Sequence, residues 1–338
     1  MTSSSSASGA GRAAEIVFDR ATKRYPGRSQ PAVSSLSLVI PAGEICVLVG
    51  PSGGGKTTAM KMVNRLIDIT EGDIRIDGRS VRSLERTALR RGIGYVIQQV
   101  GLFPHMTVAQ NIGTVPRLLG WDRRRVGDRA RELVELVGLD PEADLDRYPN
   151  ELSGGQRQRV GLARAMAVDP PLMLMDEPFG AIDPITRERL QDEFLRLHRE
   201  IRKTVVFVTH DIDEAIKMGD RIAILREGGV LAQYATPDEI LASPADEFVA
   251  RFVGADRGLK RLALASLGDL ELEPVNGRPP APLRAPVGAS LRDALSLMLS
   301  EGAVAITAVD GDGRPVGVAT LELVSEQLSH RRPQRRAS

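Results

Sequence analysis

The sequence predicts an α/β fold in which a mixed sheet carries a phosphate-binding loop at the end of one strand. Three observations lead to this prediction. The segment Gly50–Thr57, GPSGGGKT, matches the phosphate-loop pattern G-x-x-x-x-G-K-[ST] at every fixed position. The apolar run Ile45–Val49 is typical of a short buried strand, and residues 57–66 can continue as a helix. Two later apolar runs, Leu172–Met175 and Val205–Thr209, are typical of buried parallel strands.

The chemistry of the loop explains why these residue types occur together. Glycines let successive backbone N–H groups point at one centre, where the positive end of the following helix also attracts phosphate oxygens. Lys56 is predicted to reach the β- and γ-phosphates, and the Thr57 hydroxyl is predicted to ligate Mg²⁺. A glycine-rich turn with a chance lysine is the alternative, but it leaves the flanking strand and helix unexplained. The residues assigned to ATP binding in this loop are Gly50, Pro51, Ser52, Gly53, Gly54, Gly55, Lys56, Thr57 and Thr58.

Length and composition limit the classes of protein to which the chain can belong. The chain has 338 residues, a length compatible with two domains, and its 45 basic residues balance 44 acidic ones, so no charge excess indicates nucleic acid as a partner. A single cysteine, Cys46 within an apolar run, excludes an intrachain disulfide and is expected to be a core residue and not a nucleophile. Residues 1–13 are rich in Ser, Ala and Gly without an apolar stretch, which indicates a disordered tail and not a signal peptide. No apolar run is long enough to span a membrane, so we expect a reducing, cytosolic compartment.

The first part of the chain predicts short strands. Residues 14–25 and 36–40 alternate in polarity, which indicates an antiparallel patch before the phosphate loop. Tyr25 follows in an exposed turn, where its ring could stack on a purine base or could simply cover the sheet edge. Residues 72–78 and 93–97 are predicted strands, and Gln98 comes directly after the second.

From about residue 100 to 168 the pattern becomes helical, with helices expected at Val108–Ile112 and Arg123–Val137. Another helix is expected to begin at Ser153, and the spacing of Ser153 and Gln156 is that of a capping box. Capping does not explain Gly154 and Gly155, because glycine is a poor helix former. These glycines make sense if another molecule approaches their N–H groups closely. The two interpretations are compatible.

Polar residues follow two of the predicted parallel strands. Asp176 and Glu177 come after the first, at the strand end where ligand sites form in open α/β sheets. Asp176 suits a Mg²⁺ shell and Glu177 could polarise an attacking water, although a surface pair capping the helix from Pro184 is the alternative. His210 follows the second strand and is therefore expected near the γ-phosphate, with a satisfied core histidine as the alternative.

Over about residues 14–254 this set of residues resembles the nucleotide-binding subunit of an ATP-binding-cassette (ABC) transporter. The segment Leu152–Gln156 is identical to the LSGGQ signature of that family, and residues 180–183 match its D-loop, with Gly and Ile where Ser and Leu are commoner. The resemblance implies a P-loop NTPase cassette with a mixed sheet core, an antiparallel subdomain and a helical subdomain. It also implies roles for single residues: Tyr25 stacks on the base, Gln98, Glu177 and His210 act in catalysis, Thr57, Gln98 and Asp176 hold Mg²⁺, and Asp183 belongs to the D-loop.

The resemblance further implies partners. Two copies of the chain are expected to assemble head to tail, with each ATP between Lys56 of one copy and the signature of the other. The signature residues assigned to the ATP of the opposite subunit are Ser153, Gly154, Gly155 and Gln156. The helical insert resembles the part that docks transmembrane permease subunits, with Gln98 and residues 102–106 at the contact, although these residues could form an ordinary loop. We therefore expect a peripheral protein on the cytoplasmic face of the cell membrane.

The C-terminal part predicts a second, small α/β domain. A helix at 290–299, a strand at 303–309, a turn at 310–313, a strand at 316–319 and a helix at 321–328 resemble one cystathionine-β-synthase (CBS) repeat within residues 288–329. Residues 255–287, with a Pro-rich stretch at 277–286, are a connector or a degenerate repeat. CBS repeats that bind nucleotides commonly carry T-x-x-D, but Thr320 is followed at that spacing by Leu323, so a dimerising or docking role is at least as well supported. The basic residues 330–338 are expected to be a solvated tail, with contact to anionic lipid as the alternative.

A cassette with such a C-terminal region resembles the ATPase subunits of glycine betaine, carnitine, choline and proline importers, which work with a separate substrate-binding protein. An importer of another class, for example for amino acids, is an alternative. A soluble cassette ATPase acting on nucleic acid or ribosomes is disfavoured, because the chain has one phosphate loop, no long heptad stretch between Lys56 and Ser153, and a near-neutral charge. A cassette that binds ATP without turnover is disfavoured by Glu177 and His210 both being present.

Overall fold

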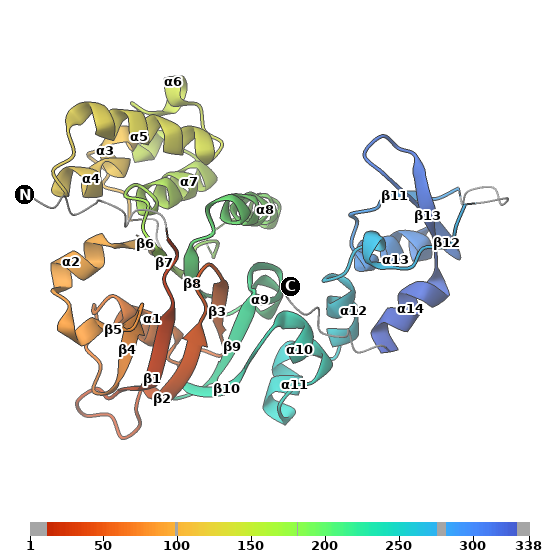
Figure 1. The fold of residues 1–338 in the computed structure, drawn as a ribbon, viewed down its shortest axis with the longest axis horizontal. Helices are drawn as coiled ribbons and strands as arrows, with labels where there is room; N and C mark the ends of the chain where they lie inside the picture. The colour runs from red at the N-terminus through yellow and green to blue at the C-terminus, as the bar shows by residue number, and fades with distance from the viewer. Residues whose placement is uncertain (1–11, 99–100, 181, 276–281, 330–338) are drawn as a thin grey trace, which may run out of the picture. The chain divides into compact units, whose positions relative to one another are not determined.

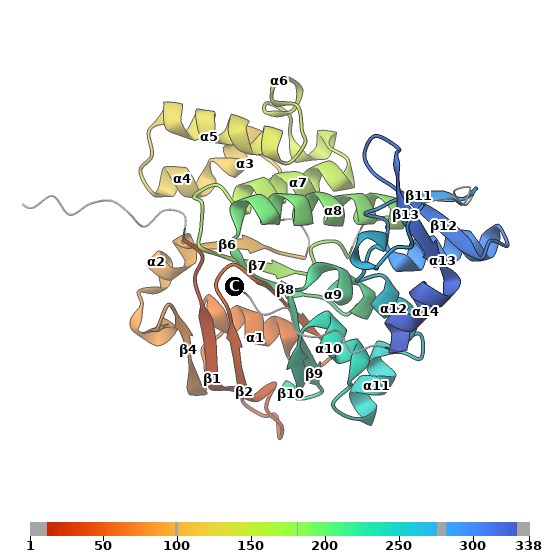
Figure 2. The same cartoon turned by 45° about the vertical axis from the view of Figure 1, so that its right-hand side comes forward.

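The computed structural model describes residues 12–98, 101–180, 182–275 and 282–329 (Figures 1 and 2). The chain divides into two compact units, one ending at Ala235 and one beginning at Thr236. The predicted tails fall largely on residues 1–11 and 330–338, which lie outside the described residues, as do 99–100, 181 and 276–281.

The first unit contains two sheets. An antiparallel sheet has the order β2-β1-β4-β5, and a six-stranded sheet has the order β10-β9-β3-β8-β7-β6. In the second sheet neighbouring strands run parallel except at the edge, where β10 is antiparallel to β9. The strands are β1 (Ile16–Lys23), β2 (Val33–Ile40), β3 (Ile45–Val49), β4 (Glu71–Ile76), β5 (Arg79–Ser80), β6 (Ile93–Val96), β7 (Leu172–Asp176), β8 (Thr204–Val208), β9 (Arg221–Arg226) and β10 (Val230–Ala235).

Helices cover the six-stranded sheet, and those between β6 and β7 gather at one side of it in both views (Figures 1 and 2). The helix α7 packs against β6. The helices of this unit are α1 (Lys56–Val63), α2 (Arg86–Arg91), α3 (Val108–Ile112), α4 (Thr114–Leu118), α5 (Arg123–Leu136), α6 (Pro141–Asp144), α7 (Gly154–Ala165), α8 (Pro184–Ile201) and α9 (Ile212–Met218). The predicted mixed sheet core, antiparallel sheet and helical group are thus confirmed.

The helix α1 is shorter than predicted. The sequence indicated a helix to residue 66, but α1 ends at Val63, with Asn64 as its C-cap. Arg65 has a φ of 52° in the left-handed region, which an α-helix cannot accommodate. The apolar side chains of α1 share one buried core with both sheets, as shown by Met60, Ile16 of β1 and Val206 of β8. This core holds the start of α1, and with it the phosphate loop, in a fixed position.

The second unit has its own small core around a three-stranded sheet of order β11-β12-β13. Its elements are α10 (Pro237–Ala242), α11 (Glu247–Val253), α12 (Arg257–Leu262), β11 (Arg284–Pro286), α13 (Leu291–Ser300), β12 (Ala305–Val309), β13 (Pro315–Thr320) and α14 (Leu321–Ser329). The helix-strand-turn-strand-helix order from residue 291 onward follows the sequence-based expectation.

Two features of this unit differ from the sequence-based boundaries. The nucleotide-binding domain predicted to residue 254 extends past the start of the second compact unit at Thr236, where α10 packs against α12 and Asp238 pairs with Arg261 at 3.0 Å. Within the predicted connector, Arg284–Pro286 forms β11, which pairs in parallel with β12. Leu267 and Leu270 from the same segment are buried in the core. None of the helices in the described ranges is long and apolar enough to cross a membrane.

Cys46 gives a direct test of the buried position of β3. Its side chain is 0% exposed, and burial raises the pKa of the thiol to about 12. Because the thiolate is the reactive form, we predict that iodoacetamide does not label the folded protein at pH 8. The same reagent should label Cys46 fully after unfolding in urea, as measured by mass spectrometry of the intact chain. Rapid labelling of the folded protein would contradict the buried position.

Candidate nucleotide-binding site

The phosphate loop connects β3 to α1, and its glycines adopt conformations that other residues avoid. Gly53 and Gly55 have φ values of 81° and 73°. A Cβ added at Gly55 would lie 2.2 Å from the carbonyl oxygen of Ala32 and 3.1 Å from the Cα of Gly229. At Gly50 it would lie 2.1 Å from the carbonyl oxygen of Leu225. The loop therefore packs with its backbone directly against other backbone, and only glycine fits.

Lys56 folds back over this loop. Its Nζ donates hydrogen bonds to the carbonyl oxygens of Gly50 at 2.7 Å and Pro51 at 2.9 Å. Burial lowers the pKa of the Lys56 ammonium, while the carboxylates of Glu177 and Asp176 act in the opposite direction. The ammonium is thus positioned among carbonyl groups next to two acidic residues, where it can pair with further negative charge.

The strand register brings the acidic residues to the loop. Asp176 is paired with Val208, so β7 and β8 end side by side. The hydroxyl of Thr57 donates to Oδ1 of Asp176 at 2.9 Å, and Nζ of Lys61 lies 4.0 Å from Oδ2. Burial is the main reason why the pKa of Asp176 is raised. Lys61 was not among the residues that the sequence predicted for the site. Its i, i+4 spacing from Thr57 could have indicated it, because that spacing places both side chains on one face of α1.

Glu177 is held by the two other residues that were predicted to act in catalysis. Nε2 of Gln98 donates to Oε2 of Glu177 at 2.7 Å, and Nδ1 of His210 lies 3.1 Å from Oε1. The backbone of Glu177 has a φ of 45°, a conformation that is costly for a residue other than glycine and is often found at functional sites. The structure therefore brings Gln98, Glu177 and His210 together, from segments that follow three neighbouring strands.

The donor set at this strand end fits Mg²⁺. The Thr57 hydroxyl and the Asp176 carboxylate already adjoin, and both are hard oxygen ligands. No group of three or more His, Cys, Asp or Glu side chains could hold a metal ion in the described part of the chain. A magnesium ion here would therefore need ligands from a phosphate group, as Mg²⁺ sites that bind nucleotides commonly do.

A pocket of about 1050 Å³ opens above the loop, close to the upper end of the range for small-molecule sites. Ser52–Thr58 and Glu177 line one part of it, and Tyr25 lines another. The sequence did not indicate three further lining segments, which are Gly27–Ala32, Glu227 and Gly228. The only local signal in these segments is turn-forming glycine, and that signal does not show which loop a turn packs against.

The signature segment lies elsewhere. Ser153 is the N-cap of α7, and the predicted capping box is confirmed, since Ser153 Oγ accepts from Gln156 N at 3.2 Å and Gln156 Oε1 accepts from Ser153 N at 2.9 Å. Ser153 and Gly154 are exposed, and a Cβ added at Gly154 would meet open space. The residues that line the pocket do not include Ser153–Gln156. The N-terminus of α7 is thus exposed at Ser153 and Gly154, so another molecule can approach it.

Asp183 is also outside the pocket lining. Its carboxylate caps α8 by accepting a hydrogen bond from the backbone N–H of Thr186 at 3.0 Å, and this bond lowers the pKa of Asp183. Within one chain, Asp183 therefore acts as a helix cap.

Comparisons with known proteins agree with this geometry. A profile of the family described as ABC transporter matches residues 33–180. The osmoprotectant import ATP-binding protein OsmV of Salmonella typhimurium is 51% identical over 307 residues, which cover 89% of this chain and 78% of that protein. The glycine betaine/carnitine/choline transport ATP-binding protein OpuCA of Bacillus subtilis is 49% identical over 312 residues, covering 92% of this chain and 80% of that protein.

Solved structures show the same likeness. The dimeric structure of MJ0796, described as a bacterial ABC transporter cassette, has a TM-score of 0.59 and 35% identity, covering 66% of this chain and 98% of its own. A dimeric post-hydrolysis state of that cassette bound to ADP and phosphate has a TM-score of 0.58 and 34% identity, with the same coverage.

The packing of the phosphate loop predicts the outcome of one substitution. Gly55→Ala should weaken ATP binding by about a hundredfold or more, since the new Cβ must displace the loop and misdirect its N–H donors. Gly78→Ala is the matched control, because Gly78 has a φ of 74° but open space around it. The control should cost about 1–2 kcal/mol in stability, because its Cβ would sit in the left-handed conformation, and should leave ATP binding unchanged. Calorimetric titration with ATP measures the affinity of both variants, and thermal unfolding measures their stability. Normal ATP binding by Gly55→Ala would contradict the packing argument.

Proposed function

Because the chain belongs to the ABC transporter family and is an ATPase of that type, we propose that it energises uptake of quaternary-amine osmoprotectants through a membrane importer. Glycine betaine, carnitine and choline are the substrates in question. The relatives of about 50% identity are named as ATP-binding proteins of such import systems, and the similarity covers about nine tenths of this chain. These names favour osmoprotectants over the alternative of an amino-acid importer or a soluble cassette acting on nucleic acid.

The arrangement around Glu177 is the observation that carries the hydrolytic part of this proposal. Lys56 neutralises phosphate charge, and the Glu177 carboxylate accepts a proton from the attacking water. Gln98 and His210, each bonded to one carboxylate oxygen, orient that group. A Mg²⁺ ion held near Thr57 and Asp176 would supply electrostatic stabilisation of the phosphate oxygens. Tyr25 lines the same pocket beyond the loop, where its ring can stack on the adenine base.

A second copy of the chain is proposed to complete the site. Ser153 and Gly154 are exposed at the N-terminus of α7, which suits phosphate binding, but they do not line the pocket of their own chain. The similar solved cassettes are dimeric. In the proposed head-to-tail dimer, the signature of one copy faces the phosphate loop of the other, and loss of the γ-phosphate lets the two copies separate.

The membrane subunits are proposed to dock near Phe103, at the cytoplasmic face of the membrane. The Phe103 side chain is 41% exposed and its ring lies 6.1 Å from that of His105. Buried Asn111 supports this turn, because its amide accepts from Phe103 N at 2.8 Å and donates to Met106 O at 3.0 Å. An exposed aromatic side chain on a turn with a fixed backbone is a typical anchor of a protein interface. A substrate-binding protein would deliver the solute to the permease.

The catalytic assignment predicts the behaviour of Glu177→Gln. The variant should bind ATP with normal affinity but hydrolyse it at least about a hundredfold more slowly, since it lacks a proton acceptor. It should also accumulate as an ATP-bound dimer in size-exclusion chromatography. Glu247→Gln, at an exposed position on α11, is the matched control and should keep wild-type turnover. Unchanged turnover in Glu177→Gln would exclude Glu177 as the base.

The transport assignment predicts that uptake depends on this chain. In a strain that lacks the gene, the wild-type chain should restore uptake of radiolabelled glycine betaine, choline or carnitine at high osmolarity. Lys56→Ala should not restore it, because the phosphates are no longer neutralised. Restored uptake of amino acids, without restored uptake of quaternary amines, would favour the alternative importer class.

A further inference from the structure

The ammonium group of Lys23 lies against the ring of Tyr25, and Lys23 does not line the nucleotide pocket. Nζ of Lys23 lies over the Tyr25 ring, 5.1 Å from its centroid, within the range of a cation–π interaction. Tyr25 lines the pocket, but Lys23 is not one of the lining residues. The ammonium therefore lies against the ring of a pocket-lining residue without lining the pocket itself.

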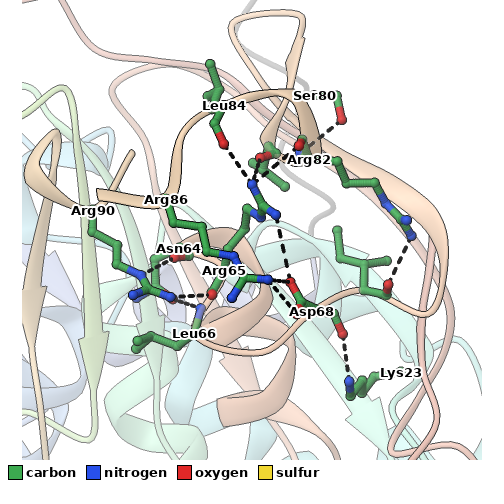
Figure 3. Close-up of polar contacts among 12 residues, drawn as sticks. Lys23, Asn64, Arg65, Leu66, Asp68, Ser80, Arg82, Leu84, Arg86 and Arg90 are labelled. Carbon is green, nitrogen blue, oxygen red and sulfur yellow. Dashed lines mark hydrogen bonds and ion pairs between the residues drawn. The ribbon is translucent and has the colours of Figure 1, made fainter. Parts of the chain in front are cut away.

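The ammonium of Lys23 is held in place by the loop that follows α1. It donates a hydrogen bond to the carbonyl oxygen of Asp68 at 2.8 Å (Figure 3). The backbone on both sides of Lys23 binds the same loop, since Thr70 N donates to Thr22 O at 2.8 Å and Arg24 N donates to Thr70 Oγ1 at 3.1 Å. Side chain and backbone of this strand end are thus fixed to one segment.

Arginines hold that loop in turn (Figure 3). Arg86 donates to both carboxylate oxygens of Asp68, at 2.9 and 2.8 Å. Arg90 of α2 donates to the carbonyl oxygens of Asn64 and Arg65. Two of these four bonds end on backbone carbonyl groups and the other two end on the Asp68 carboxylate, so together they fix the path of the loop. The position of the Asp68 carbonyl, and with it the Lys23 ammonium, is therefore set by the fold.

We propose that Lys23 is a positioning residue for the base platform, fixing the Tyr25 ring and strengthening its stacking on a purine base. This inference rests on the proposed role of Tyr25 as the stacking aromatic. An ammonium on one face withdraws electron density from the ring, which favours contact with an electron-rich base on the other face. Its hydrogen bond to Asp68 also limits the orientations that the ring can adopt.

The proposal separates base binding from phosphate binding. Lys23→Met keeps the length of the side chain but removes the ammonium. Its dissociation constant for ATP should rise by up to about two- to fivefold, because the free energy of one cation–π interaction is the upper limit of what the ammonium can add to stacking. Its kcat should stay unchanged, because stacking is equally strong in the ground state and the transition state. Its affinity for inorganic tripolyphosphate, which has no base, should also stay unchanged.

Two further variants show whether Lys23 acts through Tyr25. Lys23→Arg should keep wild-type affinity for ATP, since a guanidinium also packs on an aromatic face. In a Tyr25→Ala background, Lys23→Met should cause no additional loss. Lys260→Met is the matched control, because the Lys260 ammonium also donates to a backbone carbonyl, that of Val253 at 3.0 Å, but lies in the second unit. It should leave ATP binding unchanged.

The titrations distinguish failure of the positioning role of Lys23 from failure of the proposed stacking role of Tyr25. If Lys23→Met weakens ATP and tripolyphosphate equally, or adds its full effect to Tyr25→Ala, Lys23 acts on phosphate or on folding and the inference is overturned. If Tyr25→Ala weakens ATP binding but Lys23→Met does not, only the inference fails. If Tyr25→Ala leaves ATP binding unchanged, the proposed base platform itself is wrong.

Discussion

The close backbone packing around the phosphate loop is the constraint on which the site depends. At the two ends of the glycine run there is no room for a side chain, since a Cβ at Gly50 would lie 2.1 Å from Leu225 O and one at Gly55 would lie 2.2 Å from Ala32 O. Backbone packed on backbone leaves the N–H groups of the loop with fixed directions. Donors that cannot turn away lose little entropy when they bind phosphate. A glycine-rich sequence, flexible by itself, thus becomes a rigid loop through its surroundings, as the proposed phosphate site requires.

The parallel sheet supplies the acidic half of the site in a similar way. Strands that end side by side place the residues that follow them at one edge, which is why Asp176, Glu177 and His210 meet there although they come from different strands. The left-handed backbone of Glu177 is costly by itself, but a hydrogen bond from Glu177 N to Val208 O holds it. The side chain is then oriented by Gln98.

The sequence predicted most features that depend on local pattern. The strand Ile45–Val49 and the capping box at Ser153 agree residue by residue, because burial of both faces and helix capping leave local signatures. The strand β11 was not predicted, because it forms only through pairing with β12, more than twenty residues along the chain. The same holds for Glu227 in the pocket and for the contact of Lys23 with the Tyr25 ring. Tertiary packing, and not propensity, decides these positions.

The two ends of the pocket lie on different sheets. Tyr25 follows β1 of the antiparallel sheet, whereas the phosphate loop follows β3 of the six-stranded sheet, and α1 shares one core with both. Arg86 and Asp68 are 50% and 58% exposed, so their ion pair contributes little to the free energy of folding. Their more important effect is geometric, because they fix the Asp68 carbonyl that binds Lys23. The positions of Tyr25 and of the phosphate loop therefore depend on one buried core, and a polar loop at the surface holds the Lys23 side chain beside the Tyr25 ring.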